Sequence, residues 1–193
     1  MLQYCAAIIC STSPEPYNWM GSLADQVGFG RVSPHDQEWP QVPVVFFLVH
    51  AAVPEDEKAR LISTVRGNGV FRFSPIMLVS EEGKPRVRTL VEYHQAGFDD
   101  AVTVDGDLSE LTARIKSQLN DEQVYYSTPT YFGPDRRRWE RQPTRTISQL
   151  LPYERYRIRR DALTGIRAIE HQSFGQTAAP DTPAARVAQS GRY

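Results

Sequence analysis

The alternation of apolar and amphipathic segments through the first 119 residues is the feature that most constrains the fold. The apolar segments are rich in Val, Ile and Phe, as in buried strands, and they are residues 3–10, 42–49, 75–80 and 101–104. The intervening segments have the apolar spacing of helices, and they are residues 15–27, 54–66, 84–96 and 107–119. Strands that alternate with helices predict right-handed crossovers and a parallel, doubly wound α/β sheet.

The predicted helices differ in how clearly they show an inward face. In residues 54–66, the side chains of Ala59, Ile62 and Val65 are expected to face the sheet. In residues 107–119, the inward residues are expected to be Leu108, Leu111, Ile115 and Leu119. The polar stretch after residue 30 contains Pro34, Pro40 and Pro43, which leave little room for a regular helix.

Function in a doubly wound sheet is expected at the carboxyl ends of the strands, because the ends of parallel strands meet at one edge. In this chain those ends are predicted at Cys10–Thr12, Val49–Ala52, Ser80–Glu81 and Val104–Asp105. These four short segments are therefore the first place to look for a site.

The chain divides by charge and composition into three parts. Residues 1–123 hold 10 basic and 17 acidic side chains, a net charge of −7, and residues 124–193 hold 12 Arg and 6 acidic side chains, a net charge of +6. We predict an α/β domain over 1–123 and an Arg-rich and aromatic extension over 124–171. The extension is expected to be largely irregular, with one or two short helices in 147–169. Residues 172–193 are expected to be disordered.

The cysteines and the apolar content indicate where the protein resides. Cys5 and Cys10 lie about 16 Å apart on an extended strand and face opposite sides, so we expect two buried, reduced thiols. The apolar start of the chain lacks a basic leader and is too short for a signal peptide with its cleavage site. No apolar run approaches the roughly 18 residues of a membrane span. A cytoplasmic protein is expected.

Three strings, in this order and spacing, resemble the receiver domain of two-component response regulators. They are VVFFLVHAAVP (44–54), PIMLVS (75–80) and AGFDDAVTVD (96–105). The resemblance covers roughly residues 1–120. It implies a three-layer fold around a five-stranded parallel sheet of the flavodoxin-like kind, with the family's second helix shortened or absent in 31–41.

The resemblance also implies a phosphorylation site that this sequence has lost. The family uses an acidic pair after the first strand and an acceptor Asp after the third to hold Mg²⁺ and accept a phosphoryl group. The acidic pair corresponds to Ser11 and Thr12, the acceptor to His50, and the Lys after the fifth strand to Val104. Only the hydroxyl residue remains, as Ser80. We therefore expect no aspartyl phosphorylation, and we expect neither a metal nor a cofactor.

The string TYFGPDRRRWERQ (130–142) resembles a segment that follows some stand-alone alphaproteobacterial receiver proteins. A turn is predicted at 133–135, and the side chains that it would present for binding are Arg136, Arg137, Arg138, Trp139 and Arg141. Arg interleaved with aromatic residues suits an acidic protein face, a cyclic dinucleotide or nucleic acid. The string could equally fold back onto the acidic first part of the chain. A second basic run, Arg155 to Arg160, could form one face of a short helix.

These observations favour a binding protein over an enzyme. The sequence has no Gly-rich phosphate loop, no G-x-S-x-G or H-E-x-x-H motif, and its four histidines, His35, His50, His94 and His171, are scattered. We expect a pseudo-receiver that binds a protein partner. The resemblance places Arg88, Tyr93, Ala101 and Thr103 near the face that receivers usually present to partners. The alternatives are a sensor of a cyclic dinucleotide or other phosphate ligand, and a nucleic-acid binder.

Overall fold

The first sheet is built from five parallel strands. The computed structural model describes residues 1–81, 93, 96–104, 108–135 and 152–175. The strands are β1 (Ala6–Cys10), β2 (Arg31–Pro34), β3 (Val45–His50), β4 (Ile76–Ser80) and β5 (Asp100–Thr103). Their order is β2-β1-β3-β4-β5, and every neighbouring pair is parallel. This is the flavodoxin-like doubly wound order, so the predicted fold class is confirmed.

Strand β2 lies in the polar stretch where the residue pattern did not place a strand. Among the described strands it pairs with β1 alone and forms one edge of the sheet, with one of its four residues buried. An edge strand of this kind needs less apolar surface than the central β1 and β3, whose residues are all buried. The segment between β2 and β3 contains no helix, as the prolines predicted.

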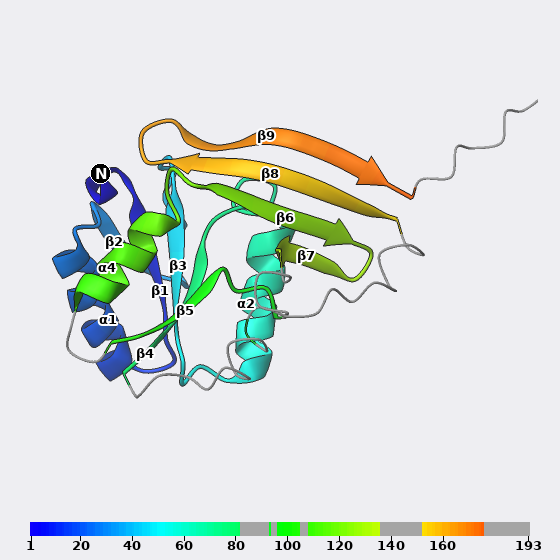
Figure 1. Cartoon of the computed structure of the whole chain (residues 1–193). Helices are drawn as coiled ribbons and strands as arrows, with labels where there is room; N and C mark the ends of the chain where they lie inside the picture. The colour runs from blue at the N-terminus through cyan, green and yellow to red at the C-terminus, as the bar shows by residue number, and fades with distance from the viewer. Residues whose placement is uncertain (82–92, 94–95, 105–107, 136–151, 176–193) are drawn as a thin grey trace, which may run out of the picture.

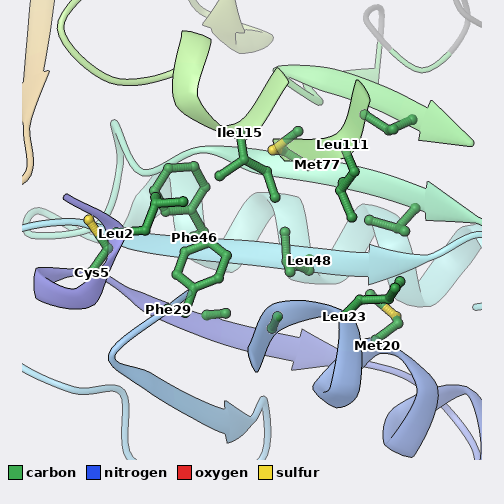
Figure 2. Close-up of a cluster of buried hydrophobic side chains, with 14 of the residues drawn as sticks. Leu2, Cys5, Met20, Leu23, Phe29, Phe46, Leu48, Met77, Leu111 and Ile115 are labelled. Carbon is green, nitrogen blue, oxygen red and sulfur yellow. The ribbon is translucent and has the colours of Figure 1, made fainter. Parts of the chain in front are cut away.

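Three helices of the described residues flank the sheet in two layers (Figure 1). They are α1 (Pro14–Val27), α2 (Glu55–Gly67) and α4 (Leu108–Ser117). Side chains of α1 and α4 pack on one face of the sheet, and Figure 2 shows this cluster, with Met20 and Leu23 of α1 and Leu111 and Ile115 of α4 around Leu48. Side chains of α2 pack on the opposite face. The predicted helix over 84–96 lies almost wholly outside the described residues.

Two local predictions about the first sheet were wrong. Residues 3 and 4 belong to a short 3₁₀ turn, η1 (Leu2–Tyr4), because Leu2 turns inward and its carbonyl oxygen accepts a hydrogen bond from the Cys5 amide at 2.8 Å. Ala59 is exposed, and the buried residues of α2 include Lys58 and Arg66 beside Ile62 and Val65. The predicted placement of the cysteines is confirmed: Cys5 and Cys10 are free, buried, and in the clusters of opposite faces.

The extension forms a second, antiparallel sheet. Its strands are β6 (Glu122–Thr128), β7 (Tyr131–Pro134), β8 (Tyr153–Asp161) and β9 (Gly165–Phe174), in the order β7-β6-β8-β9. The expectation of irregular chain with short helices is therefore wrong for the described residues of this region. Gly133 and Pro134 lie in β7, and the turn falls at residues 129–130. Strand β9 also includes Gln172–Phe174, which were expected to be disordered.

The basic run 155–160 lies in β8 and alternates with period two. Ile158 and Arg160 are buried, while Arg155, Arg157 and Arg159 face the other side. On that outer side they lie near two carboxylates of neighbouring strands, Glu122 and Glu170. The alternation is difficult to recognise in the sequence because a charged residue occupies one of the buried positions.

The second sheet packs against the amino ends of the strands of the first sheet (Figure 1). The Asn120 amide donates to the carbonyl oxygen of Arg160 at 2.7 Å. Gly165, with φ of +89°, lies so close to the chain before β3 that an added Cβ would be 3.2 Å from the Pro43 carbonyl oxygen. The carboxyl ends of the first sheet are thus on the side away from the second sheet.

Candidate functional site

The degenerate phosphorylation-site positions lie together at the carboxyl edge of the first sheet. Ser11 and Thr12 follow β1, His50 ends β3, Ser80 ends β4 and Val104 follows β5. Strand pairing sets His50 beside Val79 and Ser80 beside Thr103. Parallel topology thus brings these five positions to one edge, although none of them carries a carboxylate.

His50 has the most unusual environment at this edge. Its residue surface is only 9% exposed, and the edge of one ring faces Trp19 at a centroid distance of 5.9 Å. Nδ1 accepts a hydrogen bond from the Ala52 amide at 3.2 Å, so the neutral ring carries its proton on Nε2. Nε2 is buried and has no hydrogen-bond partner in the described part of the protein.

Burial lowers the pKa of His50 below its ordinary value. The charge of Glu81 opposes this shift, and the charge of Lys58 adds to it. The ring is therefore neutral near neutral pH, and its chemistry is that of a hydrogen-bond donor at Nε2. A neutral donor can bind an oxygen acceptor of a ligand, but it cannot replace the carboxylate of an acceptor Asp.

Lys58 is a buried cation beside this edge that the sequence analysis missed. Its Nζ donates to the Ala51 carbonyl oxygen at 2.8 Å and to a Glu55 carboxylate oxygen at 2.7 Å. It also lies 5.6 Å from the centroid of the Tyr93 ring. The spacing of Lys58 four residues before Ile62 is the signal that could have indicated it.

The hydroxyl and carboxylate groups of this edge do not form a metal site in the described residues. The Ser11 hydroxyl donates to the Ser13 carbonyl oxygen at 2.9 Å. Glu55, a nearby carboxylate, is bonded to Lys58. No group of three or more His, Cys, Asp or Glu residues within the described ranges is arranged to hold a metal ion.

The pH dependence of stability should report the buried His50 ring. Because the folded-state pKa of His50 is lowered, the unfolded chain binds more protons as the pH falls through about 6.5, and the free energy of unfolding should decrease there. His50→Asn keeps an acceptor near the position of Nδ1 but does not titrate. Urea denaturation from about pH 7 to about pH 5 should show a smaller decrease in the free energy of unfolding for this variant than for the parent.

His35→Asn, at an exposed histidine, should behave like the parent. Equal pH dependence in parent and His50→Asn would contradict this assignment.

Asp99 anchors the second sheet to the first. Its side chain is 4% exposed. Its Oδ2 accepts a hydrogen bond from the Arg66 guanidinium at 2.6 Å and another from the Ile76 amide at 2.8 Å. Oδ1 accepts from Arg160 of β8 at 2.8 Å and from the Tyr125 hydroxyl of β6. We call these four side chains, Arg66, Asp99, Tyr125 and Arg160, the Asp99 cluster.

Electrostatics keep the Asp99 carboxyl ionised. Burial alone would raise its pKa, but the charges of Arg66 and Arg160, with hydrogen bonds from Tyr125 and Ile76, bring the pKa below its usual value. Burial raises the pKa of Tyr125, so the phenol keeps its proton and its O–H donates a hydrogen bond to Asp99. The Asp99 cluster therefore buries two cations and one anion.

Arg160 makes the connections from β8. Its side chain is fully buried, Nε donates to the Phe73 carbonyl oxygen at 2.9 Å, and Nη1 donates to the Gln118 side-chain oxygen at 2.8 Å. Nη2 donates to Asp99 and to the Tyr125 hydroxyl. Arg160 thus bonds to the segments before β4 and β5 and to the end of α4, and it fixes the second sheet on the body.

Aromatic packing covers the same junction. The Arg72 guanidinium carbon lies 4.9 Å, 4.3 Å and 5.0 Å from the ring centroids of Phe73, Phe132 and Tyr156. Phe132 belongs to β7, within the string that resembles the receiver-associated segment. In the described part of this string, Phe132 contacts Arg72 and Phe73 of the body. The alternative that the Arg-rich string folds back onto the acidic body stays a prediction, because its arginines lie outside the described residues.

The remaining predicted binding residues are divided between described and undescribed parts of the chain. Tyr93 is half-buried and packs against Phe98 at a ring-centroid distance of 5.9 Å, and Ala101 is buried. Thr103 ends β5 and is half-buried. Six further candidates lie outside the described residues, and they are Arg88, Arg136, Arg137, Arg138, Trp139 and Arg141. Ligand binding by the Arg-rich string stays a prediction.

A cavity of about 300 Å³ lies between α4, β5, β6 and β7 next to the Asp99 cluster. Its wall includes Asp100 and Glu122, which suggests at first a place for a cation. These carboxylates already have partners, because Asp100 pairs with Arg114 at 2.9 Å and Glu122 with Arg159 at 3.1 Å. The cavity therefore does not form a distinct cation site.

Comparisons with known proteins leave the family unassigned. No protein-family model matches the sequence, and no curated protein matches it. Among solved structures, a signal receiver domain of a signal transduction histidine kinase from Syntrophus aciditrophicus is 17% identical, with a TM-score of 0.43, and the match covers 58% of this chain and 87% of that one. None of the helices in the described ranges is both long and apolar enough to cross a membrane. The fold assignment rests on the strand order and register of the first sheet.

Proposed function

We propose that this protein is a non-phosphorylatable pseudo-receiver that acts as an adaptor by binding a protein partner in a two-component-type signalling pathway of the cytoplasm. The observation that carries the proposal is His50. It occupies the end of the central strand β3, where the family resemblance implies an acceptor Asp, and it is buried and neutral. A buried neutral imidazole supplies neither the nucleophilic carboxylate nor a ligand that favours Mg²⁺.

The sequence around this edge supports the same proposal. Asp and Glu are absent from residues 4–14 and 41–54, so a shift of the alignment by one residue restores neither the acidic pair nor the acceptor. A doubly wound domain without its chemistry can still offer surfaces for recognition, because fold and activity are separable. Without phosphorylation, the first domain has no covalent input that would shift it between two states.

Incubation with acetyl phosphate and Mg²⁺ tests the first part of the proposal. The intact mass of the purified protein is expected to stay unchanged, while an ordinary receiver treated in parallel gains one phosphoryl group. The reason is that His50 stands at the end of β3, in place of the carboxylate that would form the acyl phosphate. A mass gain in the parent that is absent from His50→Asn would identify His50 as the acceptor and would contradict the proposal.

Affinity capture with the full chain tests the adaptor role. The amount of a captured protein partner should be the same with and without acetyl phosphate and Mg²⁺, because binding does not depend on phosphorylation. A partner that is retained only in the presence of the phosphodonor would contradict the proposal. A purified candidate that passes this comparison can then be measured by titration calorimetry.

A further inference from the structure

Strand β9 is the longest edge strand of the two sheets in the described residues. The edge strands of the two sheets are β2, β5, β7 and β9, and the first three span four residues each, whereas β9 spans ten. β2 and β7 end in proline, whereas β9 contains neither proline nor lysine. Among the described strands, β9 pairs only with β8. A long edge without these protective residues is a template for pairing with another strand.

Exposed apolar side chains follow this edge. Three of the large hydrophobic side chains that are exposed in the described structure belong to the β8–β9 hairpin, and they are Leu163 in its turn, Ile169 and Phe174. Ile169, which is 42% exposed, lies at an irregularity where the register against β8 shifts, and Phe174 ends the strand, stacked on Tyr153 at 4.7 Å. Exposed apolar groups on an edge strand and its turn indicate a surface that another chain covers.

The charges of β9 indicate which kind of chain covers this edge. Arg167 lies opposite Arg159 and Glu170 opposite Arg157, so the irregularity at Ile169 leaves Arg167 and Glu170 on one face. Arg167 is exposed and forms no salt bridge with a described residue, although the like charge of Arg159 lies across from it. Hydrogen bonds from the Thr164 and Leu163 amides and the charge of Arg167 lower the pKa of Asp161, so Arg167 already has one carboxylate nearby. Like charges directly opposite one another destabilise a sheet, so a further carboxylate would stabilise Arg167 beside Arg159.

We propose that β9 pairs antiparallel with β9 of a second copy of this chain, centred between residues 168 and 169. In this register Arg167 of each copy lies opposite Glu170 of the other. Leu163 of each copy lies beside Phe174 of the other, and the two Ile169 side chains meet near the twofold axis. The strand is thus complementary to itself in charge and in apolar contacts, and Glu170, which bonds Arg157 of its own copy at 2.8 Å, would be shared with Arg167 of the other copy. This self-association is independent of the proposed adaptor function.

Sedimentation velocity of the full chain over a wide range of concentrations tests the proposal. The parent is expected to form a reversible dimer. Ile169→Lys and Ile169→Glu should each raise the dissociation constant about tenfold or more, because each sets two like charges at the twofold axis. An equimolar mixture of the two variants should restore the dimer as a heterodimer. Val70→Lys, at a 67% exposed apolar residue of the body, is the matched control and should dimerise like the parent.

Arg167→Glu provides a second variant with little risk to the fold, since the new carboxylate faces Arg159 across the hairpin. It should also weaken the dimer, because it places two carboxylates opposite each other. Near-ultraviolet circular dichroism checks that every variant is folded. A parent that stays monomeric throughout, an Ile169→Lys effect no larger than that of Val70→Lys, or a mixture that stays monomeric would each overturn the proposal.

Discussion

Asp99→Asn is expected to lower the free energy of unfolding by about 3–5 kcal/mol, the cost typical of removing one partner of a buried ion pair. The substitution leaves the Arg66 and Arg160 guanidinium groups buried without a counter-charge. Urea denaturation at neutral pH, followed by circular dichroism, measures the change.

An exposed acid provides the control for Asp99→Asn. Asp56 pairs with Arg60 one helical turn away, and both side chains are more than 70% exposed, so Asp56→Asn should change the free energy of unfolding by less than about 1 kcal/mol. Equal losses in the two variants would show that the Asp99 cluster contributes no more than a surface ion pair.

Acid should lower the stability of the protein by protonating the Asp99 carboxyl. The folded-state pKa of Asp99 lies below its unfolded value, so its contribution to stability is present above about pH 4 and is lost as the pH falls from there through the folded-state pKa. The difference in stability between parent and Asp99→Asn should therefore narrow in that acidic range. A constant difference would contradict the direction of the shift.

Arg160→Met is expected to lower the free energy of unfolding by about 2–6 kcal/mol, because each of two buried acceptors left without its donor costs about 1–3 kcal/mol. The variant leaves the Phe73 carbonyl and the Gln118 side chain without the Arg160 donor, but Asp99 keeps Arg66. The loss should fall mainly on the junction. Hydrogen exchange is expected to accelerate in β6 and β8 more than in β1 and β3.

The neighbouring residue is the matched control for Arg160→Met. Arg159 precedes it on the same strand, faces outward, and pairs with Glu122 on the surface. Arg159→Met should leave exchange in β6 and β8 close to that of the parent. Faster hydrogen exchange in both variants would indicate a general effect on β8. If Arg160→Met accelerated hydrogen exchange equally in both sheets, the two sheets would unfold as one unit.

The position of the second sheet separates the effects of the Asp99 and Arg160 variants from the candidate functional site. It covers the amino ends of the first sheet, on the side away from the carboxyl edge with His50. The anchoring of the second sheet and the properties of that edge can therefore be tested separately. Variants of the Asp99 cluster probe the anchoring, and His50→Asn probes the edge.

The elements of the first sheet could be predicted from local sequence patterns. The buried strands β1, β3 and β4 have continuous apolar runs, and α1 and α4 have clear apolar faces, because burial on both faces or on one face leaves a period in the sequence. Once the strands are parallel, their carboxyl ends must meet, so the grouping of Ser11, His50 and Ser80 also followed from the sequence. Strand β2 was not placed, since an edge strand needs less apolar surface.

Only the tertiary structure showed that the extension forms a second sheet and which charged residues are buried. Arg159 and Arg160 are adjacent and chemically identical, yet one lies at the surface and the other is fully buried, because only Arg160 points toward Asp99, 61 residues earlier in the chain. Lys58 and Arg66 likewise occupy buried positions on α2 because carbonyl and carboxylate oxygens from other segments meet them there. A local pattern treats a charged residue as a surface residue, and only the folded chain supplies the partners that make its burial stable.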